Sequence, residues 1–217
     1  MNDSVVLADG FYFPIKDEHF KNKIRKDILT TEEIGPRFIS KFCNNKKTVI
    51  QAGGNCGIYS QIYSEIFETV YTFEPDPINF FCLVQNIKNT NVIKFQSCLG
   101  LDHKLVSVNI NEKSVIKKGY NCGTFRVTGT GNIPTLKIDD LALESCDLIH
   151  LDIEGFEGFA IQGAIETIKK YKPVICLEVN GLLKNYGWDH EKLNNLVLSL
   201  GYEFKTVTEN DHVYMPL

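Results

Sequence analysis

The sequence has 217 residues, a mass of 24.6 kDa, a formal net charge of -4 and a pI near 5.8. The length suits one α/β domain with a short extension rather than two full domains, and the acidic balance disfavours a nucleic-acid partner. No segment approaches the roughly 18 consecutive apolar residues of a membrane span. The seven cysteines stand singly without zinc-site spacing, so a cytoplasmic protein with buried thiols is expected.

The first 46 residues are expected to form a helical extension or lid in front of a domain that spans residues 47–217. Apolar and aromatic residues come first, and a polar stretch with helical spacing follows. Thr30 or Thr31 is a suitable N-cap for a further helix with acidic residues in its first turn. The expected elements are an apolar run at Val5–Leu7, an aromatic cluster at Phe11–Phe13, a helix over Asp17–Leu29 and a helix from Thr31 into Phe42.

From Lys47 onward, short apolar runs alternate with segments of helical periodicity. This alternation predicts βαβ units and a parallel sheet, whose ligands lie outside the carboxyl ends of the strands. The expected strands are Val49–Ala52, Val70–Glu74, Val92–Gln96, Asp147–Asp152, Pro173–Asn180, Tyr202–Thr208 and His212–Met215. The expected helices are Gly57–Phe67, Pro77–Lys88, a helix that follows the turn Ile153–Glu157 and reaches Lys170, and Asp189–Leu200.

Residues 101–135 interrupt this rhythm. Leu105–Ile110 alternates as an exposed strand should, and Gly123–Val127 is expected as a second short strand among several glycines. We interpret this segment as an insertion of hairpins beside the site, and a plain surface meander is the alternative.

The run from Thr48 to Ser60 passes from a β-branched strand through a glycine cluster into a helix start. Glycines allow positive φ and close approach of a ligand to the main chain, and the helix start offers free N–H groups. Counted from Ala52, the glycines approximate the dinucleotide fingerprint; counted from Gly53, they match an S-adenosylmethionine turn. Glu74 lies about 20 residues further on and suits either cofactor. A glycine turn without any ligand is the third interpretation.

The sequence carries four characteristic segments in order: Val49–Ser60, Tyr71–Pro77, Leu151–Glu157 with Gly163–Ala164, and Pro173–Glu178. Together they resemble the FkbM-type methyltransferases over about residues 47–180. The resemblance implies a Rossmann-like class I methyltransferase fold, with a mostly parallel seven-stranded sheet, helices on both faces and a C-terminal antiparallel hairpin. It also implies S-adenosylmethionine as cofactor and O-methylation of a hydroxyl on a sugar or small metabolite.

The same resemblance implies the cofactor contacts. The glycine turn surrounds the methionine end, and Glu74 accepts both ribose hydroxyls, which suits a carboxylate with two oxygens. Residues after the second and third strands border the adenine. The residues expected at the cofactor are Gly53, Gly54, Asn55, Gly57, Glu74, Asp76, Ser97, Cys98 and Asp152.

Two residues depart from the family pattern. Gln51 stands where Asp is usual, and His150 stands where Lys is common. An amide still forms hydrogen bonds, so cofactor binding is expected to survive with altered electrostatics. A hydrogen-bonded core histidine is the plainer interpretation of His150.

An attacking hydroxyl must lose a proton, and Asp152 is the first candidate to accept it, with Glu154, His150 and Glu178 as further candidates. We assign no metal ligands, although carboxylates at one crevice are able to hold a divalent cation. The expected partner is a small-molecule or carbohydrate acceptor, without nucleic acid or membrane, and the oligomeric state is left open. A nicotinamide-dependent oxidoreductase and a non-catalytic cofactor-binding interaction module are the alternative functions.

Overall fold

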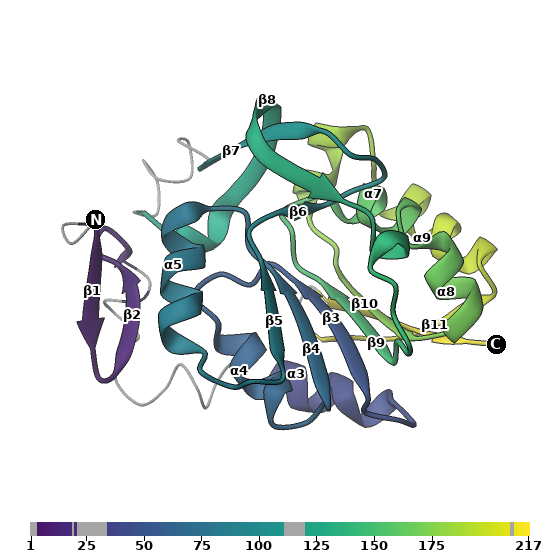
Figure 1. The fold of residues 1–217 in the computed structure, drawn as a ribbon. Coiled ribbons are helices and arrows are strands. Elements are labelled where there is room, and N and C mark those ends of the chain that lie inside the picture. Colours follow the sequence, from purple (N-terminus) through teal and green to yellow (C-terminus); the bar gives the residue numbers. More distant parts are fainter. Residues whose placement is uncertain (1–3, 19, 21–33, 111–119, 209–210) are drawn as a thin grey trace.

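The computed structural model describes residues 4–18, 20, 34–110, 120–208 and 211–217, and a seven-stranded sheet forms its centre (Figure 1). The strand order is β11-β12-β10-β9-β3-β4-β5. All neighbours from β10 to β5 are parallel, whereas β12 runs antiparallel to both β10 and β11. The strands are β3 (Thr48–Ala52), β4 (Thr69–Phe73), β5 (Val92–Phe95), β9 (Leu148–Leu151), β10 (Val174–Glu178), β11 (Tyr202–Thr208) and β12 (Asp211–Pro216).

The predicted mostly parallel sheet of seven strands is confirmed. The connection within the expected C-terminal hairpin is not fully described, because residues 209–210 belong to no described range. Within the described part of the chain, no helix is long and apolar enough to cross a membrane.

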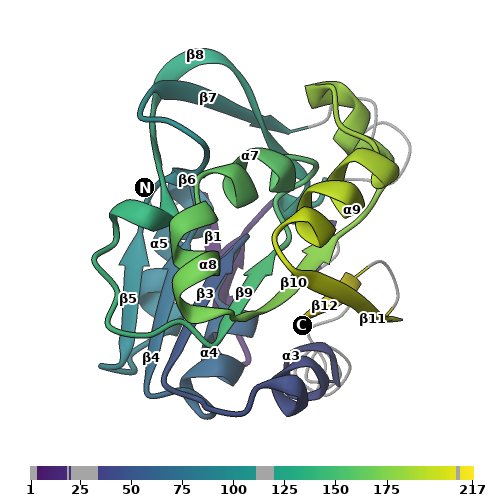
Figure 2. The ribbon, with the colours of Figure 1, turned by 90° about the vertical axis from the view of Figure 1, so that its right-hand side faces the viewer.

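Helices cover both faces of the sheet because alternate strand residues point to opposite sides. Ile50 and Ile149 pack with residues of α7 (Glu157–Gln162), α8 (Ile165–Tyr171) and α9 (His190–Ser199). Their neighbours Val49 and Leu148 pack instead with α3, α4 and α5. Figure 2 looks onto the face that α7, α8 and α9 cover. The helices of the other face are α3 (Ile34–Ile39), α4 (Ile58–Ser64) and α5 (Pro77–Asn86).

The single helix expected between the turn Ile153–Glu157 and Lys170 is wrong, because α7 and α8 are separate. A Cβ on Gly163, between them, would lie 2.0 Å from the carbonyl oxygen of Gly100, so the chain passes that backbone closely. The Asp139 carboxylate then accepts hydrogen bonds from the backbone N–H groups of Glu166 and Thr167 in the first turn of α8. The first N–H groups of a helix have no partner within that helix, and here the Asp139 side chain supplies one. In an unbroken helix these N–H groups would bond to the preceding turn instead.

The N-terminal segment begins with a strand pair and not with a helix. Strands β1 (Val5–Ala8) and β2 (Phe11–Pro14) pair antiparallel. The two residues between them, Asp9 and Gly10, have φ values of 50° and 82°. Positive φ at both central residues is the requirement of a tight hairpin turn, which Asp-Gly meets.

The remaining N-terminal predictions are tested only in part. The helix expected over Asp17–Leu29 falls almost wholly outside the described residues. The helix expected from Thr31 into Phe42 is present as α3 followed by one 3-10 turn over Ser40–Phe42.

One side chain attaches this hairpin to the main domain. The Asn86 side chain at the end of α5 accepts from the N–H of Tyr12 at 2.7 Å and donates to its carbonyl at 2.8 Å. It also donates to the carbonyl of Cys56, in the glycine turn, at 2.8 Å. The amide therefore joins the hairpin, α5 and the glycine turn.

The insertion carries a second sheet of three strands in the order β6-β8-β7. These are β6 (Cys98–Leu99), β7 (Leu105–Ile110) and β8 (Phe125–Leu136). β8 is longer than the short strand expected at Gly123–Val127, since it pairs antiparallel with β7 and also parallel with β6. Residues 111–119 lie outside the described ranges.

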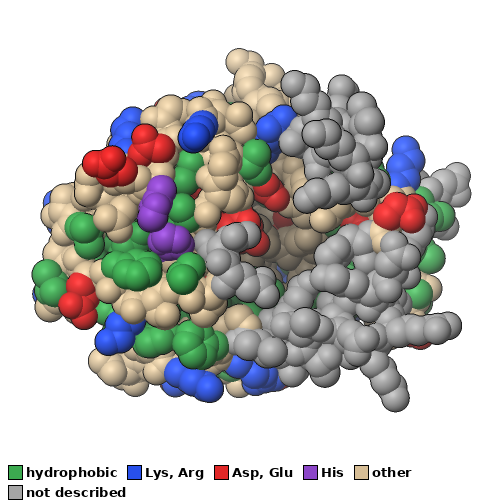
Figure 3. All heavy atoms as spheres, turned by 180° about the vertical axis from the view of Figure 1, so that it is seen from behind, with side chains coloured by type: hydrophobic (Ala, Val, Ile, Leu, Met, Phe, Trp, Pro, Cys, Tyr) green, Lys and Arg blue, Asp and Glu red, His purple; other side chains and the backbone are tan. Residues whose placement is uncertain are grey.

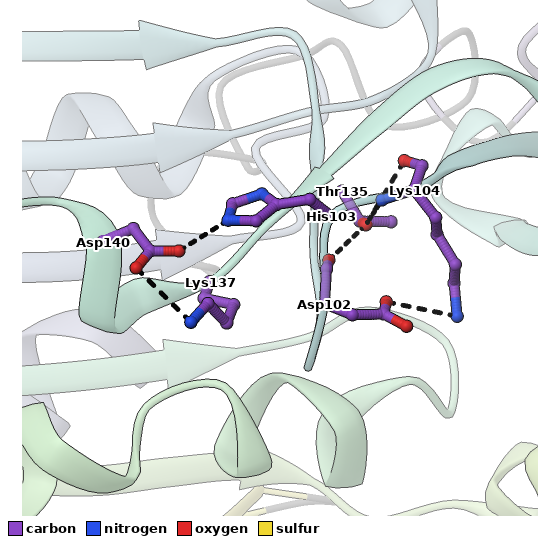
Figure 4. A network of polar contacts seen from close by, with 6 residues as sticks. All are labelled: Asp102, His103, Lys104, Thr135, Lys137 and Asp140. Carbon is purple, nitrogen blue, oxygen red and sulfur yellow. Dashed lines mark hydrogen bonds and ion pairs between the residues drawn. The ribbon is translucent and has the colours of Figure 1, made fainter.

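Polar contacts fix the loop between β6 and β7 against the end of β8 (Figure 4). The buried Thr135 hydroxyl donates to the Asp102 carbonyl at 2.6 Å and accepts from the Lys104 N–H at 2.9 Å. His103 contacts the Asp140 carboxylate at 2.7 Å. The loop is thus held to the end of β8 and to the 3-10 turn Ile138–Asp140 that follows it.

Candidate functional site

A cavity of about 700 Å³ lies at the carboxyl ends of the central strands. Residues at or directly after the ends of β3, β4, β9 and β10 line one side of it, and residues 121–127 of the insertion line another. In the space-filling view, acidic side chains are visible at the hollow of this face (Figure 3). The crevice expected for a parallel sheet is therefore present, and the insertion borders it.

The glycine turn approaches its neighbours too closely for larger residues. Gly53 has φ +86°, and a Cβ there would lie 2.0 Å from the carbonyl oxygen of Asp152. A Cβ on Gly54 would lie 2.7 Å from a Leu83 methyl group. Both glycine N–H groups donate to the carbonyl of Phe73, at 3.1 and 2.8 Å. The turn is thus fixed against the ends of β4 and β9, with its main chain lining the cavity.

Glu74 follows β4 and lines the cavity, although it is only 4% exposed. One carboxylate oxygen accepts from the Asn55 N–H at 2.7 Å, and the other accepts from the Asp76 N–H at 2.9 Å. Each oxygen keeps a further lone pair for a ligand hydroxyl. Burial raises the pKa of Glu74 to about 8, against the lowering effect of these two bonds. The backbone therefore orients this carboxyl group before any ligand binds.

Gln51 supports the turn from below and does not line the cavity. Its amide N–H donates to the Gly53 carbonyl at 2.9 Å, and its oxygen accepts from the Thr72 hydroxyl at 2.6 Å. The residue is 1% exposed. A neutral amide fits this buried place without the cost of a buried charge.

Three of the predicted proton acceptors, Asp152, Glu154 and Glu178, line the cavity together with Asp211. Burial, then Glu178 and Glu154, raise the pKa of Asp152 above its usual range. Burial and Glu178 also raise the pKa of Glu154 to about 8. Desolvation and like charges both disfavour ionisation, so these carboxyl groups hold protons more tightly than exposed ones.

Glu157 braces the loop that follows β9. Its side chain is fully buried, and one oxygen accepts from the N–H groups of Ile153 and Gly155 at 2.9 and 3.3 Å. The other oxygen, Oε2, has no hydrogen-bond partner in the part of the chain that the structure describes, and burial raises the pKa of Glu157 to about 8. The loop carrying Glu154, whose φ is 57°, is held in shape by this carboxyl group.

His150 lies in the middle of β9 and is not among the residues that line the cavity. Its Nδ1 lies 2.6 Å from the Tyr63 hydroxyl, and its ring stacks on Tyr59 at a centroid distance of 5.4 Å. Burial lowers the pKa of His150 to about 4, so the ring is neutral. The structure thus places it under the crevice floor, on the α4 face of the sheet.

The expected cofactor residues are mostly brought together. Two of them, Asp76 and Gly57, are not among the lining residues. The Asp76 carboxylate accepts from the N–H groups of Ile78 and Asn79 as the N-cap of α5. Gly57 precedes α4 with a φ of 103°. Those lining the cavity are Gly53, Gly54, Asn55, Glu74, Ser97, Cys98 and Asp152.

Sequence reasoning missed Arg126 and Asp211. Arg126 is the only Lys or Arg among the described residues that line the cavity, and it counteracts the rise in the pKa of Glu154. Its place in the glycine-rich strand of the insertion was the available signal. Asp211 carried none, because it reaches the cavity only through the pairing of β12 with β10 opposite Glu178.

The sequence matches the family model described as Methyltransferase FkbM domain over residues 52–204. The fold resembles a crystal structure of methyltransferase FkbM from Methylobacillus flagellatus KT with TM-score 0.53 and 19% identity, covering 78% of this chain and 43% of that chain. It also resembles a TehB-like SAM-dependent methyltransferase from Corynebacterium glutamicum ATCC 13032 Kitasato, with TM-score 0.50, 13% identity and coverage of 92% and 97%. Among curated proteins the sequence has no match.

Proposed function

Because this chain belongs to the FkbM methyltransferase family, we propose that it transfers a methyl group from S-adenosylmethionine to a hydroxyl of a sugar or another small metabolite. The observation that carries the proposal is Glu74, whose two oxygens are oriented by backbone N–H groups beside the glycine turn and face a cavity of about 700 Å³. A rigid carboxylate suits the two hydroxyls of a ribose.

S-adenosylmethionine is the cofactor, as the sequence predicts. Gly53 and Gly54 line the cavity without side chains, which leaves room for the methionine end of the cofactor beside the main chain. Ser97 and Cys98 come after β5 in the sequence and also line the cavity, so we assign them to the adenine.

The cofactor supplies a methyl group on a good leaving group. The protein must then align the acceptor oxygen with that methyl group and exclude water. Asp152 follows the central strand β9 and contacts the glycine turn. We therefore assign it the role of the general base that takes the proton from the attacking hydroxyl. Glu154 and Glu178 also line the cavity and are the further candidates. His150 does not line the cavity, so it is not placed to take a proton from a molecule bound there.

A thermal-shift measurement tests the cofactor assignment. S-adenosylmethionine and S-adenosylhomocysteine should raise the Tm, because a ligand that binds only the folded state stabilises it by mass action. NAD and NADP, used at the same concentrations, should leave the Tm unchanged. A shift with a nicotinamide cofactor and none with S-adenosylhomocysteine would replace this proposal with the oxidoreductase alternative.

A further inference from the structure

Three metal-ligating side chains meet beneath the crevice floor, on one face of the sheet. Cys176 in β10 is the register partner of His150 in β9. Asp211 is paired with Glu178, which lies two residues beyond Cys176 and therefore on the same face. Residues from three separate strands thus converge, although their positions in the sequence are far apart.

The ligand atoms are close enough to share one ion. The His150 nitrogen, the Cys176 sulfur and an Asp211 carboxylate oxygen all lie within 4.8 Å of one another. A tetrahedral zinc ion with ligands at about 2.0–2.3 Å requires ligand–ligand separations of about 3.3–3.8 Å, which is roughly 1.6 times the bond length. Small rotations of these side chains would therefore close the site.

One of these atoms lacks a hydrogen-bond partner. His150 is 1% exposed, and its Nε2 has none among the described residues. The nearest Asp211 oxygen is 3.8 Å away, which is beyond hydrogen-bond distance. A buried polar nitrogen without a partner is costly, and a bound cation would remove that cost.

The His150 ring is already held in the orientation that a metal ligand needs. The Tyr63 hydroxyl lies 2.6 Å from Nδ1, and the Tyr59 ring stacks on the imidazole. When Nδ1–H donates to the Tyr63 oxygen, the lone pair of Nε2 faces Cys176 and Asp211. A second hydrogen bond of this kind is the usual support of a ligating histidine.

We propose that His150, Cys176 and Asp211 bind one Zn²⁺ ion. A thiolate with an imidazole favours zinc over magnesium or calcium, which prefer oxygen ligands. Three protein ligands leave a fourth position open. Because Asp211 also lines the cavity, that position is reached from the crevice and takes water or an oxygen of a bound molecule.

Metal titration of the untagged full chain, first treated with a chelator, tests the site. Co²⁺ should bind with one equivalent and produce a sulfur-to-cobalt charge-transfer band, and Zn²⁺ should displace it. Cys176→Ser should abolish that band. Cys146→Ser is the matched control, because Cys146 is another buried free thiol, whose Sγ contacts the Leu148 carbonyl, and it should leave the band unchanged.

A further variant separates a metal site from a structural cluster. Tyr63→Phe keeps the ring and removes the support of His150, so the affinity for Zn²⁺ should fall about ten- to a hundredfold. Circular dichroism would verify that each variant is folded. Wild-type protein that binds no stoichiometric Zn²⁺, or a Co²⁺ complex without the sulfur band, would overturn the proposal whatever the variants do.

Discussion

The carboxyl group of Glu74 connects the two strands that form the cofactor side of the crevice. It accepts from the glycine turn after β3 and from the backbone that begins α5. Its orientation is therefore a property of the folded chain, and a bound diol would add to bonds that already exist. Such preorganisation lowers the entropic cost of binding.

At a pH above about 8, where the Glu74 carboxyl group is ionised, replacing Glu74 with Ala should weaken the binding of S-adenosylhomocysteine by about 1.5–3 kcal/mol, which is roughly ten- to a hundredfold, because the lost bonds are then charge-assisted. Isothermal titration calorimetry measures the change. Glu68→Ala is the control, since Glu68 is an exposed acid outside the cavity, and it should keep wild-type affinity. Unchanged affinity in a folded Glu74→Ala protein would remove this residue from the site.

Asp152→Asn should reduce turnover by about 10²–10⁴ while cofactor affinity changes far less, since the amide keeps the shape of the carboxylate but not its basicity. Because burial and Glu178 raise the pKa of Asp152, wild-type turnover should increase as the pH rises and more of this group ionises. Mass spectrometry of methyl transfer to an identified acceptor, at saturating cofactor, provides the rates. Near-normal turnover in the variant would transfer the role to Glu154 or Glu178.

At the scale of elements, the crossing of the glycine turn with the end of β9 positions the site. The φ of Gly53 is +86°, and the backbone of Asp152 occupies the space that a side chain would need. Gly201, after α9, has the same φ but nothing within 4 Å of its missing Cβ. The two glycines separate the cost of the dihedral angle from the cost of the contact.

Gly201→Ala should lower the free energy of unfolding by about 1–2 kcal/mol, the usual cost of a left-handed residue with a side chain. Gly53→Ala should lower it by clearly more, because the Asp152 carbonyl must also move. Urea denaturation of both variants tests this difference. Equal losses of stability in the two variants would mean that the Asp152 backbone moves away from the new side chain at little cost in free energy.

Some elements were predictable from the sequence and others were not, for physical reasons. The apolar strands and glycine turn around Val49 and Gly53 act through local chemistry, so their pattern indicates β3 and α4. The Asp9-Gly10 turn is also local, and its hairpin signal was overlooked. By contrast, the break at Gly163 depends on the backbone of Gly100, which only the folded chain brings near.

For the whole molecule, several buried carboxyl groups make stability depend on pH. Burial raises the pKa values of Glu74, Glu154 and Glu157 to about 8. The folded state therefore binds more protons than the unfolded state between the ordinary glutamate pKa and that value. The stability from this source is complete below the ordinary pKa and is lost as the pH rises towards 8.

The Tm should accordingly fall as the pH is raised from about 5 to about 8, a window set by the ordinary and raised glutamate values. Glu157→Gln should flatten this dependence, because the amide carries no proton to lose and keeps an oxygen for the Ile153 N–H. Glu191→Gln, at an exposed position of α9, should leave the slope unchanged. Differential scanning calorimetry across the range measures it, and a Tm that rises towards pH 8 would contradict it.

Asn86 also affects how the molecule opens. Its carboxamide forms hydrogen bonds with both the N–H and the carbonyl of Tyr12, as a neighbouring strand would. The same amide nitrogen also donates to the Cys56 carbonyl. If the β1–β2 hairpin frays, these partners are exposed together, and the support of the glycine turn is lost with them. The first strands and the cofactor turn therefore belong to one cooperative unit of local unfolding, although more than 40 residues of sequence, counting from Tyr12 to Cys56, separate them.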